Sequence, residues 1–84
     1  MGVLDKSVAV LRAVAEQPRS LADLVAVTGI ARATAHRLAT ALEVHGLVRR
    51  DGEGRYMAGP ALIGLGNAAA SSVPVAAAAA DAQH

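Results

Sequence analysis

SLADLVAVTGIARATAHRLATALEVHGLVRRDGEGRY, residues 20–56, is the stretch that decides the fold of this chain. It opens with Ser20 and Asp23, spaced as a capping box in which each side chain bonds a free backbone N–H group at the start of a helix. Gly29 suits the left-handed conformation that commonly ends a helix. Ile30 follows as an apolar residue that can fill the turn. We therefore predict a short helix that ends in a tight turn.

A longer helix is predicted from about Ala31 to His45, and a period of about 100° per residue gives it two unlike faces. Its apolar arc holds Ala31, Ala35, Leu38, Ala39 and Leu42. Its opposite arc holds Ala33, His36, Arg37, Thr40 and Val44, with Arg32 and Glu43 at one edge and Thr34 at the other. The first face should pack against the core, and the second should present positive charge to solvent.

Gly46 closes this helix, and a β-hairpin is predicted after it. Residues 47–50 and 55–58 are the two short strands, joined by the glycine-containing loop of residues 51–54. A capped helix, a glycine turn, a helix with a basic outer face and a basic hairpin together are typical of a winged helix-turn-helix. In that fold the longer helix enters the major groove of DNA, while arginines of the hairpin, the wing, reach phosphates or the minor groove.

The segments before and after residues 20–56 are each predicted to form a further helix. Upstream, we predict a first helix that is capped by Asp5 and ends at Gln17 and Pro18. Its buried stripe is predicted to consist of Val8, Leu11 and Ala15, and to be widened by Val10 and Val14. Downstream, Gly59 and Pro60 should open a fourth helix. Its apolar stripe consists of Leu62, Leu65 and Ala69.

The predicted fold class is therefore mostly α with a small antiparallel β-hairpin: a three-helix core plus wing, followed by a linker helix. We assign residues 1–59 to the winged helix-turn-helix DNA-binding domain and residues 60–72 to a linker and dimerisation helix. Residues 73–84 form an alanine-rich tail, which we expect to be disordered because nothing follows for it to pack against.

The charge pattern and the composition narrow the class of protein. The chain has 84 residues and a net charge of +1, but residues 30–57 alone carry five arginines against three acidic residues. Such a local basic patch is the footprint that phosphate backbones select. The absence of cysteine excludes disulfides and thiolate metal sites and indicates a cytoplasmic protein. The uncharged stretch from Tyr56 to Ala80 is interrupted by proline and glycine, which argues against a membrane span.

Residues 20–56 closely resemble the N-terminal domain of IclR-type transcriptional regulators. The strongest parts are Thr28-Gly29-Ile30, residues 32–38, Leu42, residues 45–48, and Gly54-Arg55-Tyr56 with Gly59 after it. The resemblance runs from about Leu4 to about Ser71. It implies a repressor or activator that binds a palindromic operator as a homodimer held by the linker helix. It also implies a separate C-terminal domain for a small-molecule effector, and we expect this chain to stop before that domain.

The candidate DNA-binding residues lie on the long helix and the wing: Arg32, Ala33, Thr34, His36, Arg37, Thr40, Arg49, Arg50 and Arg55. Many family members carry Pro, a basic residue and Ser at the turn, whereas this chain has Ala31-Arg32-Ala33. The small Ala33 therefore offers contact with a thymine methyl group in place of a hydroxyl contact. Thr34 is equally suited to capping, and Tyr56 is predicted to anchor the wing by packing.

Two alternatives to DNA binding fit the sequence less well. A winged helix can bind another protein through the same helix, but this face lacks the aromatic anchors that such interfaces favour. Residues 64–69 form a G-x-G-x-x-A motif, which binds a dinucleotide only when a strand precedes it within a βαβ unit. No Walker loop, nucleophile elbow, carboxylate pair or histidine pair four residues apart is present, so we predict no enzyme activity, no cofactor and no metal.

Overall fold

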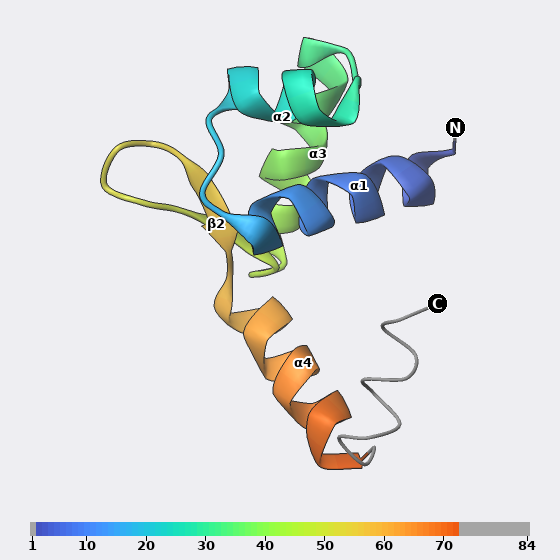
Figure 1. Ribbon diagram of the computed structural model, residues 1–84, viewed down its shortest axis with the longest axis vertical. Coiled ribbons are helices and arrows are strands. Elements are labelled where there is room, and N and C mark those ends of the chain that lie inside the picture. Colours follow the sequence, from blue (N-terminus) through green and yellow to red (C-terminus); the bar gives the residue numbers. More distant parts are fainter. Residues whose placement is uncertain (1, 73–84) are drawn as a thin grey trace.

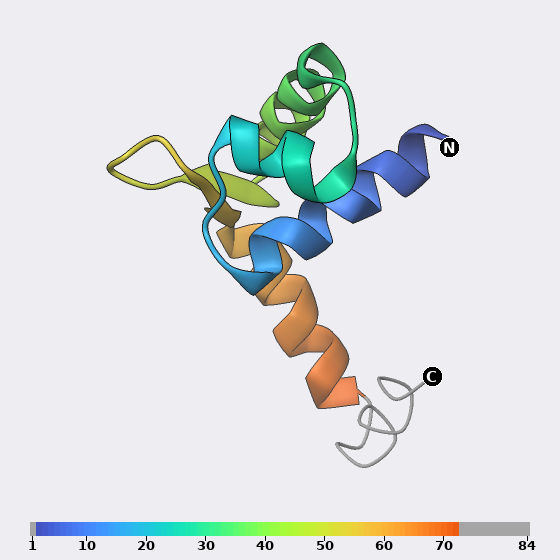
Figure 2. The ribbon, with the colours of Figure 1, turned by 45° about the horizontal axis from the view of Figure 1, so that its top comes forward.

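The computed structural model describes residues 2–72 and has six elements in chain order. They are α1 (Val3–Glu16), α2 (Leu21–Thr28), α3 (Arg32–Val44), β1 (Val48–Arg50), β2 (Tyr56–Ala58) and α4 (Pro60–Ser72). The first three helices pack on one another, the loop of the hairpin projects to one side, and α4 leads away from this body (Figure 1, Figure 2). The predicted class, mostly α with an antiparallel hairpin in a winged-helix arrangement, is confirmed. The predicted tail, residues 73–84, lies outside the described residues.

Helix α1 differs from its prediction at both its cap and its buried face. It begins at Val3 with Gly2 as the cap. Asp5 lies inside the first turn, where its Oδ2 accepts the Gly2 N–H at 3.3 Å. The buried residues are Val10, Ala13 and Val14.

The predicted stripe of α1 is therefore wrong in part. Val8 and Ala15 are exposed and Leu11 is half-buried, whereas Val10 and Val14 are buried as expected. The apolar side chains of α1 cover a wide arc, and the contacts with α2 and α3 select only the part of that arc that faces both helices.

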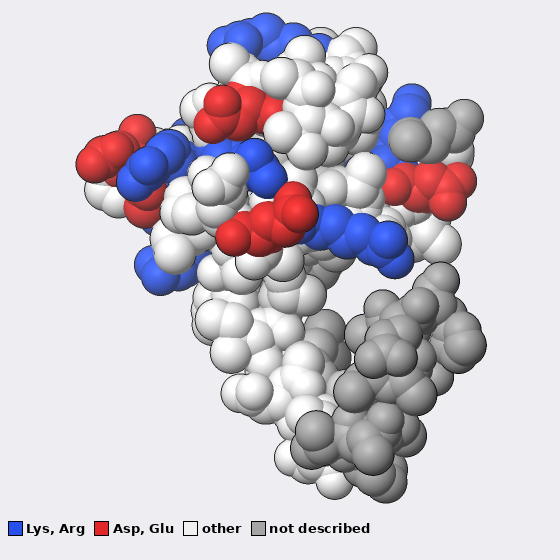
Figure 3. Space-filling model, in the orientation of Figure 1, with Lys and Arg blue, Asp and Glu red and all other residues white. Residues whose placement is uncertain are grey.

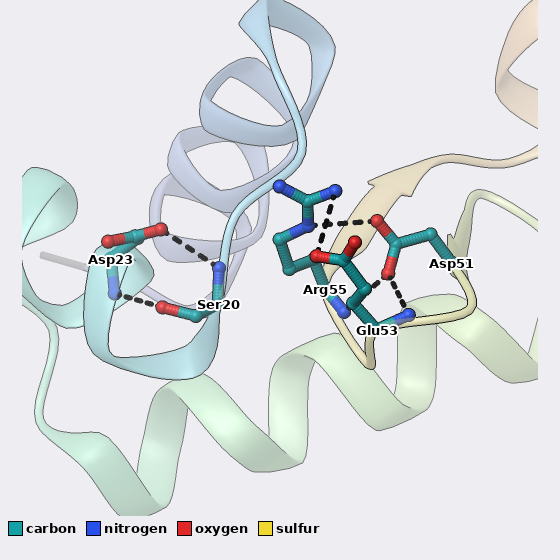
Figure 4. Close-up of polar contacts among 5 residues, drawn as sticks. All are labelled: Ser20, Asp23, Asp51, Glu53 and Arg55. Atoms are coloured by element: carbon teal, nitrogen blue, oxygen red, sulfur yellow. Dashed lines mark hydrogen bonds and ion pairs between the residues drawn. The ribbon is translucent and has the colours of Figure 1, made fainter.

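The cap at the start of α2 and the turn between α2 and α3 are both built as predicted. Asp23 donates its backbone N–H to Ser20 Oγ at 3.0 Å, and Ser20 donates its own to Asp23 Oδ2 at 3.1 Å (Figure 4). Gly29 ends α2 in the left-handed conformation, with φ of 72°. The Thr28 hydroxyl donates to the Leu24 carbonyl and accepts the Ile30 N–H, which fixes the turn. Ile30 is buried and joins the core.

The core lies between the three helices and the hairpin. Its largest fully buried side chains are Leu24, Val10 and Val48, one each from α2, α1 and β1. Helix α3 contributes Ala35, Ala39 and Leu42 from its predicted apolar arc. Of the other two residues of that arc, Leu38 is half-buried, and Ala31 is exposed because it caps the helix instead of lying within it. Because this arc is occupied by the core, the opposite arc of α3 is left for solvent or a partner.

The wing is tied to the segment between α1 and α2. Strands β1 and β2 pair antiparallel in the register Val48↔Ala58, Arg49↔Met57 and Arg50↔Tyr56. Arg19 and Tyr56 exchange two backbone hydrogen bonds, of 2.8 Å and 2.7 Å. The predicted packing role of Tyr56 is confirmed, since only 3% of the residue is exposed. The hairpin therefore rests on the helical body through both its backbone and this ring.

Helix α4 starts at Pro60 as predicted and contacts the body mainly near β1. Its side chains from Ile63 to Ser71 are exposed, including Leu65 at 62%. The G-x-G-x-x-A motif of residues 64–69 lies inside this helix rather than after a strand, so it lacks the backbone context of a dinucleotide site. Among residues 2–72, no helix combines the length and the apolar character needed to cross a membrane.

Candidate nucleic-acid interface

The outer face of α3 brings together most of the residues predicted to touch DNA. Arg32, Ala33, His36, Arg37 and Thr40 are all exposed on it. Thr34 is half-buried at the border of this face. The face is rigid in position because the opposite side of the same helix is fixed in the core.

The cations of α3 are available to a partner. Neither Arg32 nor Arg37 forms an ion pair with any residue between 2 and 72. An arginine that is not neutralised by a carboxylate keeps all its N–H groups for phosphate oxygens or for the acceptor pair of guanine. These two side chains therefore have the chemistry and the exposure that a DNA contact requires.

The start of α3 adds to this positive character. Its cap residue, Ala31, makes no side-chain hydrogen bond, and the first turn holds no acidic residue. The free backbone N–H groups and the helix dipole therefore leave a partial positive charge beside Arg32. A patch of basic side chains lies at the top of the molecule, the end at which α2 and α3 meet (Figure 3). Helix N-termini with this composition favour phosphate groups.

Arg50 of the wing is engaged within the protein. Its Nε lies 3.6 Å from Glu43 Oε1 on α3, and its Nη2 donates to the Tyr56 hydroxyl at 3.0 Å. The guanidinium carbon also lies 4.8 Å from the centre of the Tyr56 ring, within the range of a cation–π contact. Arg49 is exposed and forms no ion pair in the described part of the chain.

The tip of the wing is held by Asp51. Its Oδ1 accepts the backbone N–H groups of Glu53 and Arg55, each at 2.9 Å, and its Oδ2 accepts Arg55 Nε at 2.9 Å (Figure 4). Arg55 Nη2 also lies 3.4 Å from Glu53 Oε2. The Arg55 backbone N–H, foremost among these donors, lowers the pKa of Asp51 below its ordinary value of 3.8. Acidic and basic side chains therefore alternate on the wing surface (Figure 3).

These carboxylate partners were not predicted from the sequence. Asp51 and Arg55 are four residues apart across a predicted turn, which is a signal that an Asx-type turn would place them together. Glu43 was assigned to the edge of the basic arc, and its partner on β1 depends on how α3 packs against the hairpin. No group of three His, Cys, Asp or Glu side chains within residues 2–72 is arranged to hold a metal ion.

Residues 3–52, more than half of the chain, match the family model of the IclR helix-turn-helix domain. The chain belongs to the IclR family. This family comprises transcriptional regulators, which are not a class of enzymes. The winged helix-turn-helix of this IclR-family chain is accordingly the DNA-binding domain of a transcriptional regulator.

Solved structures agree with this assignment. A putative IclR transcriptional regulator from Silicibacter sp. TM1040 is 30% identical, with a TM-score of 0.76 over 88% of this chain and 30% of its own. HmgR from Pseudomonas aeruginosa is 28% identical, with a TM-score of 0.79 over 93% of this chain and 33% of its own. An IclR family regulator from Brucella abortus is 26% identical, with a TM-score of 0.75 over 94% of this chain and 32% of its own.

The IclR-family chain thus spans about one third of the length of each of these regulators. The comparison with curated proteins gave no match.

Proposed function

We propose that this chain reads a specific DNA sequence by placing α3 in the major groove and the wing on the backbone or in the minor groove. The observation that carries the proposal is the division of α3 into two faces. Ala35, Ala39 and Leu42 are buried in the core, while the arginines of the opposite face are exposed and have no carboxylate partner among residues 2–72. A helix of this kind suits the docking geometry of helix-turn-helix proteins.

Within this geometry, each exposed residue of α3 receives a role that fits its chemistry. Arg32 and Arg37 provide forked donors for guanine O6 and N7, and His36 and Thr40 provide single hydrogen bonds to base edges. Ala33 permits close approach to a thymine methyl group. Thr34, at the border of the face, suits a phosphate oxygen.

The wing makes contacts with the DNA backbone that do not depend on the base sequence. Arg49, Arg50 and Arg55 are its cations, and contacts to phosphate fix the orientation of a protein on the duplex. Arg49 can make such a contact directly. Arg50 and Arg55 would have to exchange a carboxylate partner for phosphate.

We further propose a homodimer that binds a palindromic operator through two copies of α3. The exposed face of α4 that contains Leu65 and Ala69 is the candidate interface, because the helix carries no charged side chain and its side chains from Ile63 to Ser71 are exposed. Figure 3 shows this helix as an uncharged extension of the molecule. Binding of a small-molecule effector is assigned to a separate C-terminal domain of the parent regulator. Such a regulator acts on chromosomal DNA in the cytoplasm and has no catalytic role.

Selection of duplexes from a random pool by the full chain tests this proposal. We expect enrichment of an inverted repeat with half-site centres one helical turn apart, about 34–36 Å. Binding of the selected duplex, followed by fluorescence anisotropy, should weaken steeply as salt rises. Recovery of an unenriched pool, together with binding that ignores salt, would refute DNA recognition and favour a protein partner for the α3 face.

A further inference from the structure

Two neighbouring arginines of the wing lie on opposite faces of the hairpin. Successive side chains of a strand alternate between faces, so Val48 and Arg50 share one face and Arg49 belongs to the other. Val48 is 1% exposed and therefore marks the face that packs on the core. The cross-strand partner of Arg50, Tyr56, is also buried, whereas Arg49 pairs with the half-buried Met57 on the outer face.

The guanidinium of Arg50 joins three elements. Nε forms an ion pair with Glu43 on α3, Nη2 donates to the Tyr56 hydroxyl on β2, and the guanidinium carbon lies over the Tyr56 ring. One exposed ion pair alone stabilises little. Here, however, the separate contacts act on a single planar group, and this planar fork is what an arginine supplies and a lysine does not.

We propose that Arg50 is a positioning residue that fixes the angle between α3 and the wing, and that Arg49 makes the phosphate contact of the wing. This division of roles rests on the proposed function. It follows from the two opposite faces of the hairpin and from the contacts that occupy Arg50.

The electrostatics of the site agree with this division. A phosphate that approached Arg50 would meet the carboxylate of Glu43, whose Oε1 lies 3.6 Å from Nε. Like charges at such a site oppose binding. Arg49 has no carboxylate partner among residues 2–72. Because backbone contacts set the register of a recognition helix, a fixed wing angle also determines which bases α3 meets.

The test compares Arg49→Gln, Arg50→Lys, Arg50→Gln and Glu43→Gln in the full chain. The probes are the duplex selected by the unmodified chain and a random duplex of equal length, titrated over a range of salt concentrations. Arg49→Gln should lower the slope of log K against log salt by about 0.9, the value of one lost phosphate contact, and weaken both duplexes alike. Arg50→Lys should keep the slope but lower the selected-to-random affinity ratio roughly tenfold, on the scale of one misread base pair.

Glu43→Gln gives a signature that a merely structural role would not produce. It removes negative charge near DNA, so affinity for the random duplex should rise while the selected-to-random ratio falls. Thermal unfolding adds a readout that needs no DNA: the melting-temperature shifts of Arg50→Lys and Glu43→Gln should be non-additive when the two are combined. Arg50 is 44% exposed in its side chain, so these variants should fold, and circular dichroism checks this.

The division of roles is overturned if Arg50→Lys binds both duplexes like the unmodified chain while Arg50→Gln lowers the slope of log K against log salt by about 0.9. That pair of results would make Arg50 itself the phosphate contact. An unchanged slope in Arg49→Gln would equally overturn it. Failure of the unmodified chain to prefer any duplex would refute the proposed function instead. Additive melting-temperature shifts of Arg50→Lys and Glu43→Gln would refute the link between Arg50 and α3, whether or not the chain binds DNA.

Discussion

Gly59 lies with its α-carbon directly against the backbone carbonyl of Gly46. A Cβ atom at Gly59 would stand 2.3 Å from the Gly46 oxygen and 2.9 Å from the carbonyl carbon of Leu47. Two hydrogen bonds of 2.9 Å accompany this approach, from Gly59 N–H to the Leu47 carbonyl and from Ala61 N–H to the Gly46 carbonyl. The segment after α3 and the start of α4 are therefore joined backbone to backbone.

Gly59→Ala should lower the free energy of unfolding by about 1–3 kcal/mol, because the backbone must move to admit the methyl group. Gly64→Ala is the matched control: apart from its own helical turn, nothing in the described part of the chain lies within 4 Å of its Cβ position, and alanine favours a helix interior by about 0.8–1.0 kcal/mol over glycine. Urea denaturation and helicity by circular dichroism measure both. Equal stability of the two variants would show that the close approach to Gly46 does not constrain the fold.

Arg19→Ala should destabilise the domain by about 1–3 kcal/mol. The Arg19 Nε donates to the Ala13 carbonyl at 3.0 Å, its Nη2 contacts Glu16 at 2.9 Å, and its side chain is only 12% exposed. Loss of the side chain leaves a carbonyl near the end of α1 without its partner. Arg12→Ala, on the exposed side of the same helix, should change stability by no more than about 0.5 kcal/mol. Similar thermal shifts for the two variants would contradict this role of Arg19.

Arg37→Ala should weaken binding to the selected duplex by about 1–3 kcal/mol and relax the sequence preference at one position. Arg32→Ala should have an effect of the same size if its fork also reaches a base. Arg12→Ala removes the same charge outside the α3 face and serves as the control. Gel-shift titrations measure all three, and the assignment of α3 as the reading helix fails if both α3 variants bind like the unmodified chain.

The wing tip should loosen in acid. Hydrogen bonds from Arg55 and Glu53 lower the pKa of Asp51, so its carboxylate is favoured in the folded state. The Asp51 carboxylate therefore stabilises the folded wing tip fully above pH 3.8, the ordinary pKa of the group. This stabilisation is lost as the pH falls through the lower pKa of the folded state. The amide resonances of Glu53 and Arg55 should shift together over that range in NMR spectra. Asp51→Asn should abolish this transition, and its persistence in the variant would assign it to another group.

The fold was predicted best where residues within one turn bond to the free backbone groups of a helix end. The capping box of Ser20 and Asp23 and the left-handed Gly29 depend on residues within one turn, so the sequence alone was sufficient. Helix α3 was predicted correctly over most of its length because its polar and apolar arcs do not overlap, but Ala31, assigned to the apolar arc, is its exposed cap residue. The buried face of α1 was not, because Val8 and Val10 are equally apolar and only the packing of α2 and α3 distinguishes them.

The charges of the wing show a second limit of sequence reasoning. Arg49, Arg50 and Arg55 were treated as equivalent cations, since composition does not say which face of a strand a residue occupies. The register Arg50↔Tyr56 and the packing of β1 beside α3 separate them. Glu43 and Asp51 were likewise counted as charges, whereas their positions make them partners of particular arginines.

The pair of backbone hydrogen bonds between Arg19 and Tyr56 closes a loop that contains α2, α3 and β1. Loop closure costs chain entropy before such a contact stabilises anything, so pairing of this kind belongs late in folding. The three helices should therefore dock before the wing acquires its position. In the native state, the amides of Arg19 and Tyr56 should exchange with solvent only when the whole domain opens. The wing is then as persistent as the core, even though its strands are only three residues long.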